Sequence, residues 1–384
     1  MARLNNLPPY LFAEIDAARD RVAARGVDVV DLGVGDPDLP TPAALVDAAV
    51  EAMADPAHHR YPSGRGMARL RRAIAGFMRR RHGVDADPDT EILVLVGSKE
   101  GIAHLPLALV TEADNVLVPD IGYPVYGQSA ILAGAEPRPF ALRADRAFLP
   151  DPLELERLAD KGTRLIWVNY PNNPTGAEAG EGLFKPLVDL VSDRRDCVLA
   201  NDAAYLEVSL DGHRPVSLLE TVDHNRHPVI EFHSLSKMFN MTGWRIGFAV
   251  GNADVINRLA RVKESVDSGA FGVVQEVATV AMGRGADALL DEVMKPYPAR
   301  RRVIVEALGR AGLEVFDTRA TFYVWARVPA GDTSMGFCGR VLQDKGVVLT
   351  PGVGFGPGGE GWFRISLTAA DERVAEAARR LETL

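Results

Sequence analysis

The chain has 384 residues and a formal net charge of −9, and 47% of its residues are hydrophobic and 25% charged. This length supports two or three domains with a large buried core, which excludes a peptide-sized module, and the composition excludes a disordered chain or a collagen-like repeat. The mildly acidic charge argues against general nucleic-acid binding.

The middle of the chain alternates short β-branched runs with longer amphipathic stretches. This rhythm predicts βαβ units around a mostly parallel sheet. The runs at 93–96 and 165–168 are apolar on both faces, which is typical of strands that helices cover on both sides. The strands predicted for this part are 91–96, 115–118, 164–169, 197–201, 229–233 and 245–250.

Residues 253 to about 309 are predicted to be helical and to bridge two domains, because apolar residues such as Ile256, Leu259 and Val262 recur there among charged ones. An α+β unit follows, with predicted strands at 321–328 and 362–367 and predicted helices at about 334–345 and 371–384. We therefore divide the chain into an N-terminal segment of the small domain (1–45), a large domain (46–285) and the C-terminal small domain (286–384).

Two serines, a lysine and an arginine follow the predicted strand at 229–233 within twelve residues. They are Ser234, Ser236, Lys237 and Arg245. Hydroxyls and a guanidinium suit a phosphate, and an amine can form an imine with an aldehyde. Taken alone, Lys237 is equally well explained as a solvated loop lysine, and the serines as helix caps.

Polar side chains also follow the next two buried strands. Asn169 and Asn173 come after one strand and Asp202 and Tyr205 after the other, where open α/β sheets place their ligands. The asparagines lie among ordinary turn formers, so that motif alone favours a structural role. A carboxylate at the end of an apolar run is costly to bury without a cation, and a protonated pyridine nitrogen would be such a cation for Asp202.

A third motif places Ser98 and Lys99 where a strand ends and a helix begins. Free N–H groups and the positive end of the helix dipole would meet an anion there, although a capped helix start explains the motif equally well. The spacing of a P-loop is absent. The Gly-Val-Gly runs at 33–35 and 352–354 do not complete a dinucleotide-binding fingerprint, which argues against a Rossmann dehydrogenase.

Two single residues each allow a functional and a purely structural interpretation. Tyr123 could stack on a flat ring, although aromatic residues beside prolines usually serve packing. Arg364 interrupts an apolar strand, where an inward guanidinium would seek a carboxylate, whereas an edge arginine would face water.

Two cysteines are too few for a disulfide framework or a zinc site of four cysteines, so we expect no metal and a reducing, cytoplasmic environment. No apolar run reaches the roughly 18 residues of a membrane span, and we expect no membrane partner.

Together these residues resemble the class I and II aminotransferases of fold type I, which depend on pyridoxal 5′-phosphate. The resemblance runs from Leu7 to the carboxyl end and rests on motifs in a fixed order: Asn-Asn-Pro-Thr-Gly at 172–176, Asp-x-x-Tyr at 202–205, Ser-x-Ser-Lys at 234–237, and the arginine eight residues beyond the lysine. Within the family, the runs at 7–15, 33–42, 97–105 and 233–245 are similar to LL-diaminopimelate aminotransferases and their close relatives.

The resemblance implies a large domain with a mostly parallel seven-stranded sheet between helices, and a smaller α+β domain. It implies that Lys237 binds the cofactor and moves the substrate proton, that Asp202 keeps the pyridine nitrogen protonated, and that Asn173 and Tyr205 bind the ring's phenolic oxygen. Tyr123 would stack on the ring. The phosphate would be held by Ser98, Lys99, Ser234, Ser236 and Arg245.

Substrate and subunit contacts follow from the same resemblance. Arg364 would bind the substrate α-carboxylate, with hydrogen bonds from Gly35 and Asn173, and Tyr10 and Lys99 are further candidates for substrate contact. Tyr61 would reach the phosphate of a neighbouring subunit, which implies a homodimer with shared active sites. This chain has Gly64 and Arg65 where the subgroup usually has a bulky residue and an acid, and an arginine there suits a carboxylate better than a distal ammonium.

The predicted function is transfer of an amino group from an L-amino acid, with LL-diaminopimelate as one candidate, to a 2-oxo acid such as 2-oxoglutarate by a ping-pong mechanism. A lyase or cyclising synthase would use the same lysine and aspartate, so β- or γ-elimination stays open as an alternative. A third alternative is a regulatory or binding protein that kept the fold without catalysis.

Overall fold

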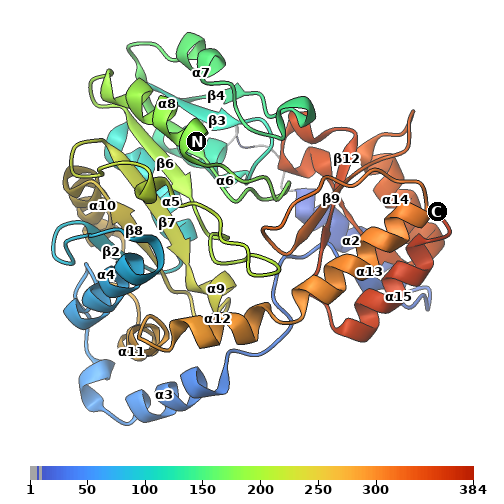
Figure 1. Ribbon diagram of the computed structural model, residues 1–384, viewed down its shortest axis with the longest axis horizontal. Helices are drawn as coiled ribbons and strands as arrows, with labels where there is room; N and C mark the ends of the chain where they lie inside the picture. Colours follow the sequence, from blue (N-terminus) through green and yellow to red (C-terminus); the bar gives the residue numbers. More distant parts are fainter. Residues whose placement is uncertain (1–6, 8–10) are drawn as a thin grey trace.

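A computed structural model describes residue 7 and residues 11–384 of the chain (Figure 1). Seven strands form one sheet in the order β2-β8-β7-β6-β5-β3-β4. Only β8 runs antiparallel to its neighbours in this sheet, which confirms the predicted mostly parallel sheet of seven strands. The strands are β2 (Ile92–Leu95), β3 (Asn115–Pro119), β4 (Glu136–Phe140), β5 (Thr163–Val168), β6 (Val198–Asp202), β7 (Val229–Ser234) and β8 (Gly247–Gly251).

Helices cover both faces of this sheet. Along β2, Ile92 and Val94 pack into one apolar cluster whereas Leu93 and Leu95 pack into another, as the alternation of side chains in a strand requires. One face is covered by α5 (Ser98–Leu109), α6 (Val125–Ala133) and α10 (Ala253–Val266), and the other by α4 (Ala68–His82), α7 (Pro152–Leu158), α8 (Glu181–Ser192) and α11 (Gly272–Ala281). The two-sided burial confirms that these strands lie in the interior of an α/β layer structure.

Two strands of the large sheet differ most from the sequence prediction, and the short strands β1, β10 and β11 outside it were not predicted either. No strand was predicted at β4, whose sequence is Glu-Pro-Arg-Pro-Phe, and its place at the sheet edge explains how two prolines are tolerated. The last strand was predicted from residue 245 but β8 begins at Gly247. Arg245 has a φ of 56°, a left-handed conformation that a strand does not accommodate.

The C-terminal third forms a second layered unit around a three-stranded antiparallel sheet, β11-β12-β9. Its elements are α13 (Tyr297–Arg310), β9 (Tyr323–Arg327), α14 (Ser334–Lys345), β10 (Val347–Val348), β11 (Thr350–Pro351), β12 (Trp362–Ser366) and α15 (Asp371–Leu381). The helix predicted at 334–345 is confirmed. The helical stretch predicted from 253 to 309 consists of α10, α11, α12 (Ala286–Met294) and α13. In Figure 1, α12 lies between the two units, and α13 packs on α15 in the second unit.

The N-terminal part of the described chain lies with this second unit. β1 (Val30–Asp31) pairs in parallel with β10, and Val30 and Leu32 pack into the same apolar cluster as Phe363 and Ile365 of β12. The helix α2 (Leu11–Ala23) precedes β1, and α3 (Ala43–Met53) then packs on α11 beside the large sheet. The domain boundaries at 45 and 285 stay predictions.

The topology brings functional side chains to one edge of the large sheet. Because β2, β3, β5, β6 and β7 are parallel, their carboxyl ends meet at that edge, which faces residues 33–36 and the small sheet. Within residue 7 and residues 11–384, no group of three or more His, Cys, Asp or Glu side chains is arranged to hold a metal ion. None of the helices in these residues combines the length and apolar character that crossing a membrane requires.

Candidate active site

A cavity of about 470 Å³ lies between the carboxyl edge of the large sheet and the small sheet. Most of the predicted site residues line it, although they come from distant parts of the chain: Gly35, Ser98, Lys99, Tyr123, Asn173, Asp202, Tyr205, Ser234, Ser236, Lys237, Arg245 and Arg364. Tyr61 is not among the lining residues and is 90% exposed. Tyr10 lies outside the described residues. The structure therefore brings most of the candidates together, and their roles stay predictions.

The carboxylate of Asp202 is buried at the end of β6. Its Oδ2 accepts a hydrogen bond from the Tyr126 hydroxyl at 2.7 Å, and its Oδ1 accepts one from the backbone N–H of Ala204 at 3.2 Å. Burial raises the pKa of Asp202 to about 6. Because both hydrogen-bond donors are neutral, this carboxylate suits a cationic ligand group.

Lys237 follows β7 in the short helix α9 (Leu235–Met238). Its Nζ donates a hydrogen bond to the backbone carbonyl of Gly35 at 2.7 Å, which joins the large sheet to the segment beside β1. Burial lowers the pKa of Lys237 to about 8, and the positive charges of Arg364 and Arg245 act in the same direction. A lysine that loses its proton this easily can act as a nucleophile near neutral pH.

The start of α5 and Arg245 form a site for an anion. Gly97 caps the helix with a φ of 78°, which favours glycine, and a Cβ atom there would lie 2.3 Å from Arg245 Nη2 and displace the guanidinium from its present position. Arg245 Nη1 donates to the carbonyl of Thr242 at 2.7 Å. With the hydroxyls of Ser234 and Ser236 in the same cavity, these groups suit a phosphate.

Arg364 lies buried in β12 on the opposite side of the cavity. Its Nη1 donates to Asn173 Oδ1 at 2.7 Å and its Nη2 to the carbonyl of Gly33 at 2.6 Å. Its Cζ lies 4.1 Å from the ring centroid of Tyr323 and 4.6 Å from that of Phe355. Its Nε has no hydrogen-bond partner among the described residues, so the guanidinium retains capacity for an anionic ligand such as a carboxylate.

Sequence reasoning missed two tyrosines in the cavity. Tyr126 binds Asp202, and the hydroxyl of Tyr323 lies 2.8 Å from that of Tyr205. Tyr126 ends the same Gly-Tyr-Pro-Val-Tyr run that contains Tyr123, so its place in that run could have marked it as a candidate site residue. Tyr323 lies in an apolar strand whose sequence gives no sign that its side chain turns toward the site.

Arg65 does not enter the cavity of its own chain. Its Nη1 donates to Asn257 Oδ1 at 2.8 Å and its Nη2 to the carbonyl of Thr90 at 3.4 Å. Burial lowers the pKa of its guanidinium. The predicted effect of Arg65 on the distal group of a substrate therefore has no basis within a single chain.

The chemistry of these groups fits pyridoxal 5′-phosphate. An amine with a lowered pKa, a buried carboxylate and a phosphate site occupy one cavity, and in the phosphate site Gly97 carries no Cβ atom beside the Arg245 guanidinium. The groups that would hold the aldehyde, the pyridine nitrogen and the phosphate are Lys237, Asp202 and the Ser98, Ser234, Ser236 and Arg245 set.

Comparisons with known proteins agree with this geometry. The sequence model of the family "Aminotransferase class I and II" matches residues 27–381. The chain is 47% identical over 382 residues to an LL-diaminopimelate aminotransferase of Aquifex aeolicus, covering 100% of this chain and 98% of the relative. It is 49% identical over 383 residues to the LL-diaminopimelate aminotransferase of Nitratidesulfovibrio vulgaris, with the same coverage. The substrate-bound structure of BacF from Bacillus subtilis superposes with a TM-score of 0.92 at 32% identity, covering 100% of this chain and 96% of that one.

Proposed function

Since the chain belongs to the class I and II aminotransferases and is a pyridoxal-phosphate-dependent transaminase, we propose that its amino donor is LL-diaminopimelate and its acceptor a 2-oxo acid such as 2-oxoglutarate. Full-length relatives at 45–49% identity that carry the name LL-diaminopimelate aminotransferase support this donor. These relatives carry the proposal of the donor, and the joint placement of Lys237, Asp202 and Arg364 around one cavity supports the transamination itself.

Each of these side chains has a task in that reaction. When bound, pyridoxal 5′-phosphate supplies an electron sink for negative charge at the substrate α-carbon. The Lys237 amine, with its lowered pKa, takes the proton from that carbon and returns it. Asp202 holds the proton on the pyridine nitrogen. Because Asn173 Oδ1 accepts from Arg364, its amide nitrogen stays available, with the Tyr205 hydroxyl, for the phenolic oxygen of the ring.

Arg364 orients the substrate through the α-carboxylate. Its guanidinium is fixed by Asn173 and by the carbonyl of Gly33, so the donor groups that remain are preorganised. Gly35 lies beside them, because its carbonyl accepts the hydrogen bond from Lys237. The Lys237 amine and the Arg364 guanidinium thus contact the same short segment, at the carbonyls of Gly35 and Gly33.

The donor is tested by single half-reactions. We expect LL-diaminopimelate to bleach the visible absorption of the cofactor rapidly, whereas L-lysine, which lacks the distal carboxylate, and L-2-aminopimelate, which lacks the distal ammonium, react more slowly. Because the three donors share the α-amino acid group, differences among them report on the distal site alone. Fast reaction of other donors with none of LL-diaminopimelate would contradict the donor but leave the transaminase activity intact. Continued formation of keto acid without an acceptor, beyond one equivalent per active site, would favour the lyase alternative.

We further propose that the chain forms a homodimer in which Tyr61 enters the neighbouring active site. The support is a group of exposed apolar side chains on and around α3 and α11, which pack together in Figure 1. Exposed apolar groups gathered on contacting elements are typical of an interface. The group consists of Val46, Val50, Met53, Tyr61, Val266, Phe271 and Val280. The cytoplasmic location stays a prediction.

Sedimentation tests the dimer. We expect a particle of twice the 41.5 kDa chain mass. Val50, 70% exposed on α3, offers an interface variant that lies outside the cavity. Val50→Glu is expected to shift the equilibrium toward monomers and to lower activity in proportion, because each site would lose Tyr61 of its neighbour. A fully active monomer would contradict shared active sites.

A further inference from the structure

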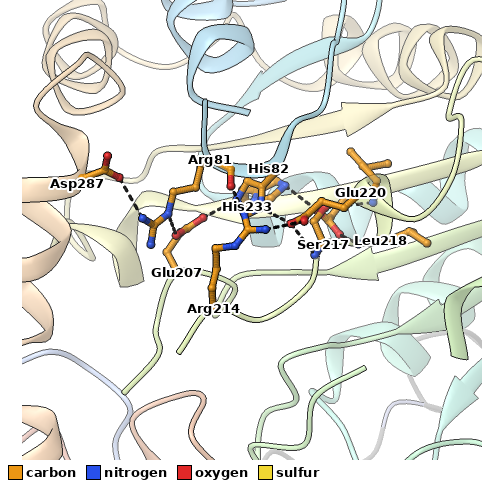
Figure 2. A network of polar contacts seen from close by, with 11 residues as sticks. Arg81, His82, Glu207, Arg214, Ser217, Leu218, Glu220, His233 and Asp287 are labelled. Carbon is orange, nitrogen blue, oxygen red and sulfur yellow. Dashed lines mark hydrogen bonds and ion pairs between the residues drawn. The ribbon is translucent and has the colours of Figure 1, made fainter. Parts of the chain in front are cut away.

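A buried network of charged side chains lies outside the cavity but shares a chain segment with it (Figure 2). Glu207 follows Tyr205 by two residues and Asp202 by five. Its side chain is 1% exposed, and Figure 2 shows it between Arg81 and His82 at the end of α4. Its Oε2 accepts from Arg81 Nε at 2.7 Å, and its Oε1 accepts from His82 Nε2 at 2.6 Å.

His82 is bonded on both sides of its ring. Its Nδ1 lies 2.7 Å from Glu220 Oε1, so that both ring nitrogens face carboxylates. Burial acts to lower the pKa of His82, but the hydrogen bonds to Glu207 and Glu220 outweigh it and raise the pKa to about 9. The imidazole is therefore protonated, and its two N–H groups hold the carboxylates of Glu207 and Glu220 at defined distances and angles.

A second branch of the network reaches the residue before Asp202. Ser217, whose backbone N–H donates to Glu220 Oε1 at 3.2 Å, donates from its hydroxyl to Glu231 Oε1 at 2.6 Å. Glu231 Oε2 in turn accepts from Asn201 Nδ2 at 3.0 Å. Continuous hydrogen bonds thus connect His82 to the end of β6, where Asn201 adjoins the carboxylate of the site.

The segment 202–207 is consequently held at both ends. At one end Asp202 accepts from Tyr126, and at the other Glu207 is held by α4. Between them the Tyr205 carbonyl accepts from the N–H of Val208 at 2.9 Å, so a shift of Glu207 moves the backbone of Tyr205. The Tyr205 side chain is also held by the contact of its hydroxyl with that of Tyr323 and by the edge-on contact of its ring with Phe322, at 5.5 Å between centroids.

Stability alone does not explain a network of this kind. Apolar side chains of similar volume usually stabilise a protein interior as well as a buried ion pair does, because charges are costly to remove from water. What a hydrogen-bonded charge adds is a defined position. We propose that Glu207 and His82 are positioning residues, which hold Tyr205 and Asp202 where they bind the ring of the cofactor. This inference rests on the roles proposed for those two residues and is independent of the identity of the amino donor.

A second histidine and glutamate pair offers a matched control. His224 Nε2 lies 3.2 Å from Glu91 Oε2, and both side chains are buried, at 5% and 7% exposure. Glu91 immediately precedes β2 and His224 lies shortly before β7, at the amino ends of the strands and away from the cavity. Loss of this pair should therefore weaken the fold without reaching the cofactor.

The experiment compares the Glu207→Gln and Glu91→Gln holoenzymes by thermal denaturation, by the rate of cofactor release after dilution, and by the pH at which the visible absorption of the cofactor changes. We expect both variants to lose thermal stability. We expect only Glu207→Gln to release cofactor roughly 10-fold faster and to change absorption at a higher pH, since a displaced Tyr205 stabilises the phenolic oxygen less. His82→Gln is expected to behave like Glu207→Gln.

A milder variant covers the case in which Glu207→Gln does not fold. Arg81, whose side chain is 27% exposed, contacts Glu207 from the surface side, and Arg81→Gln is expected to change both cofactor measurements in the same direction by a smaller amount. The proposal is overturned if the variants of the network that fold lose stability but release cofactor at the wild-type rate and keep the wild-type pH of the absorption change. The donor tests above would be unaffected by that outcome.

Discussion

Replacement of Lys237 by alanine is expected to lower kcat/KM for every amino donor by at least about 10³-fold, because it removes both the covalent attachment of the cofactor and the group that moves the proton. The structure gives the physical reason that no other residue takes over. The Lys237 amine is half-buried, it lies 2.7 Å from the carbonyl of Gly35, and burial lowers its pKa to about 8. Lys99 also lines the cavity, but its Nζ lies 5.5 Å from the centroid of the Tyr123 ring.

The matched variant is Lys237→Arg, which keeps the positive charge but offers no amine that is deprotonated near neutral pH. We expect it to be as inactive as the alanine variant and to differ from it chiefly in stability. Single-turnover kinetics with a saturating donor separate loss of chemistry from loss of binding. Turnover of Lys237→Ala at the wild-type rate would contradict the catalytic role of the lysine and favour the non-catalytic alternative.

Replacement of Arg364 by alanine is expected to cost about 2–5 kcal/mol of transition-state stabilisation, or roughly 30- to 5000-fold in kcat/KM. The loss is expected to be uniform across donors and across 2-oxo acid acceptors, because all of them carry the carboxylate that the guanidinium binds. Part of the loss comes from Asn173, whose Oδ1 would lose its charged donor at 2.7 Å. Steady-state kinetics with several amino acid substrates of different side chains measure this loss of kcat/KM.

Two further variants define the meaning of that result. Arg364→Lys keeps the charge but not the planar fork, so we expect it to recover only part of the lost activity. Arg138→Ala serves as the control, since Arg138 lies on the edge strand β4 and binds Glu136 and Asp160 outside the cavity. A loss confined to one donor in Arg364→Ala would instead make this residue a selector of the substrate side chain.

The sequence predicted most of the large sheet because its strands are short, apolar on both faces and followed by polar residues. That pattern placed Asp202, Lys237 and Ser98 at strand ends, and the parallel topology then brought these ends together. β4 was not predicted because its prolines are typical of turns. Only its position at the edge of the sheet makes these prolines compatible with a strand. Lys237, of a residue type that usually lies at the surface, proved to be half-buried in the cavity.

Side chains whose role depends on packing could not be predicted in the same way. Tyr323 looks like any aromatic residue of a buried strand, and only the register of β9 against β12, which pairs it with Ser366, sets its place near Tyr205. His82 and Glu207 are 125 positions apart in the chain, and no local pattern relates them. A buried charge is recognisable as paired only when the tertiary structure supplies its partner.

The parallel pairing of β1 with β10 has a consequence for the order in which the protein is made. Val30 leaves the ribosome more than three hundred residues before its partner Val347. The strand that ends at Asp202 and the helices that contain Ser98 and Lys237 are complete much earlier, whereas Arg364 lies in β12, much later in the sequence. Because domains generally fold as units during synthesis, the cofactor half of the cavity can assemble first. The half that binds the substrate carboxylate closes only when the last strands emerge, so a nascent chain could hold cofactor before it is able to react.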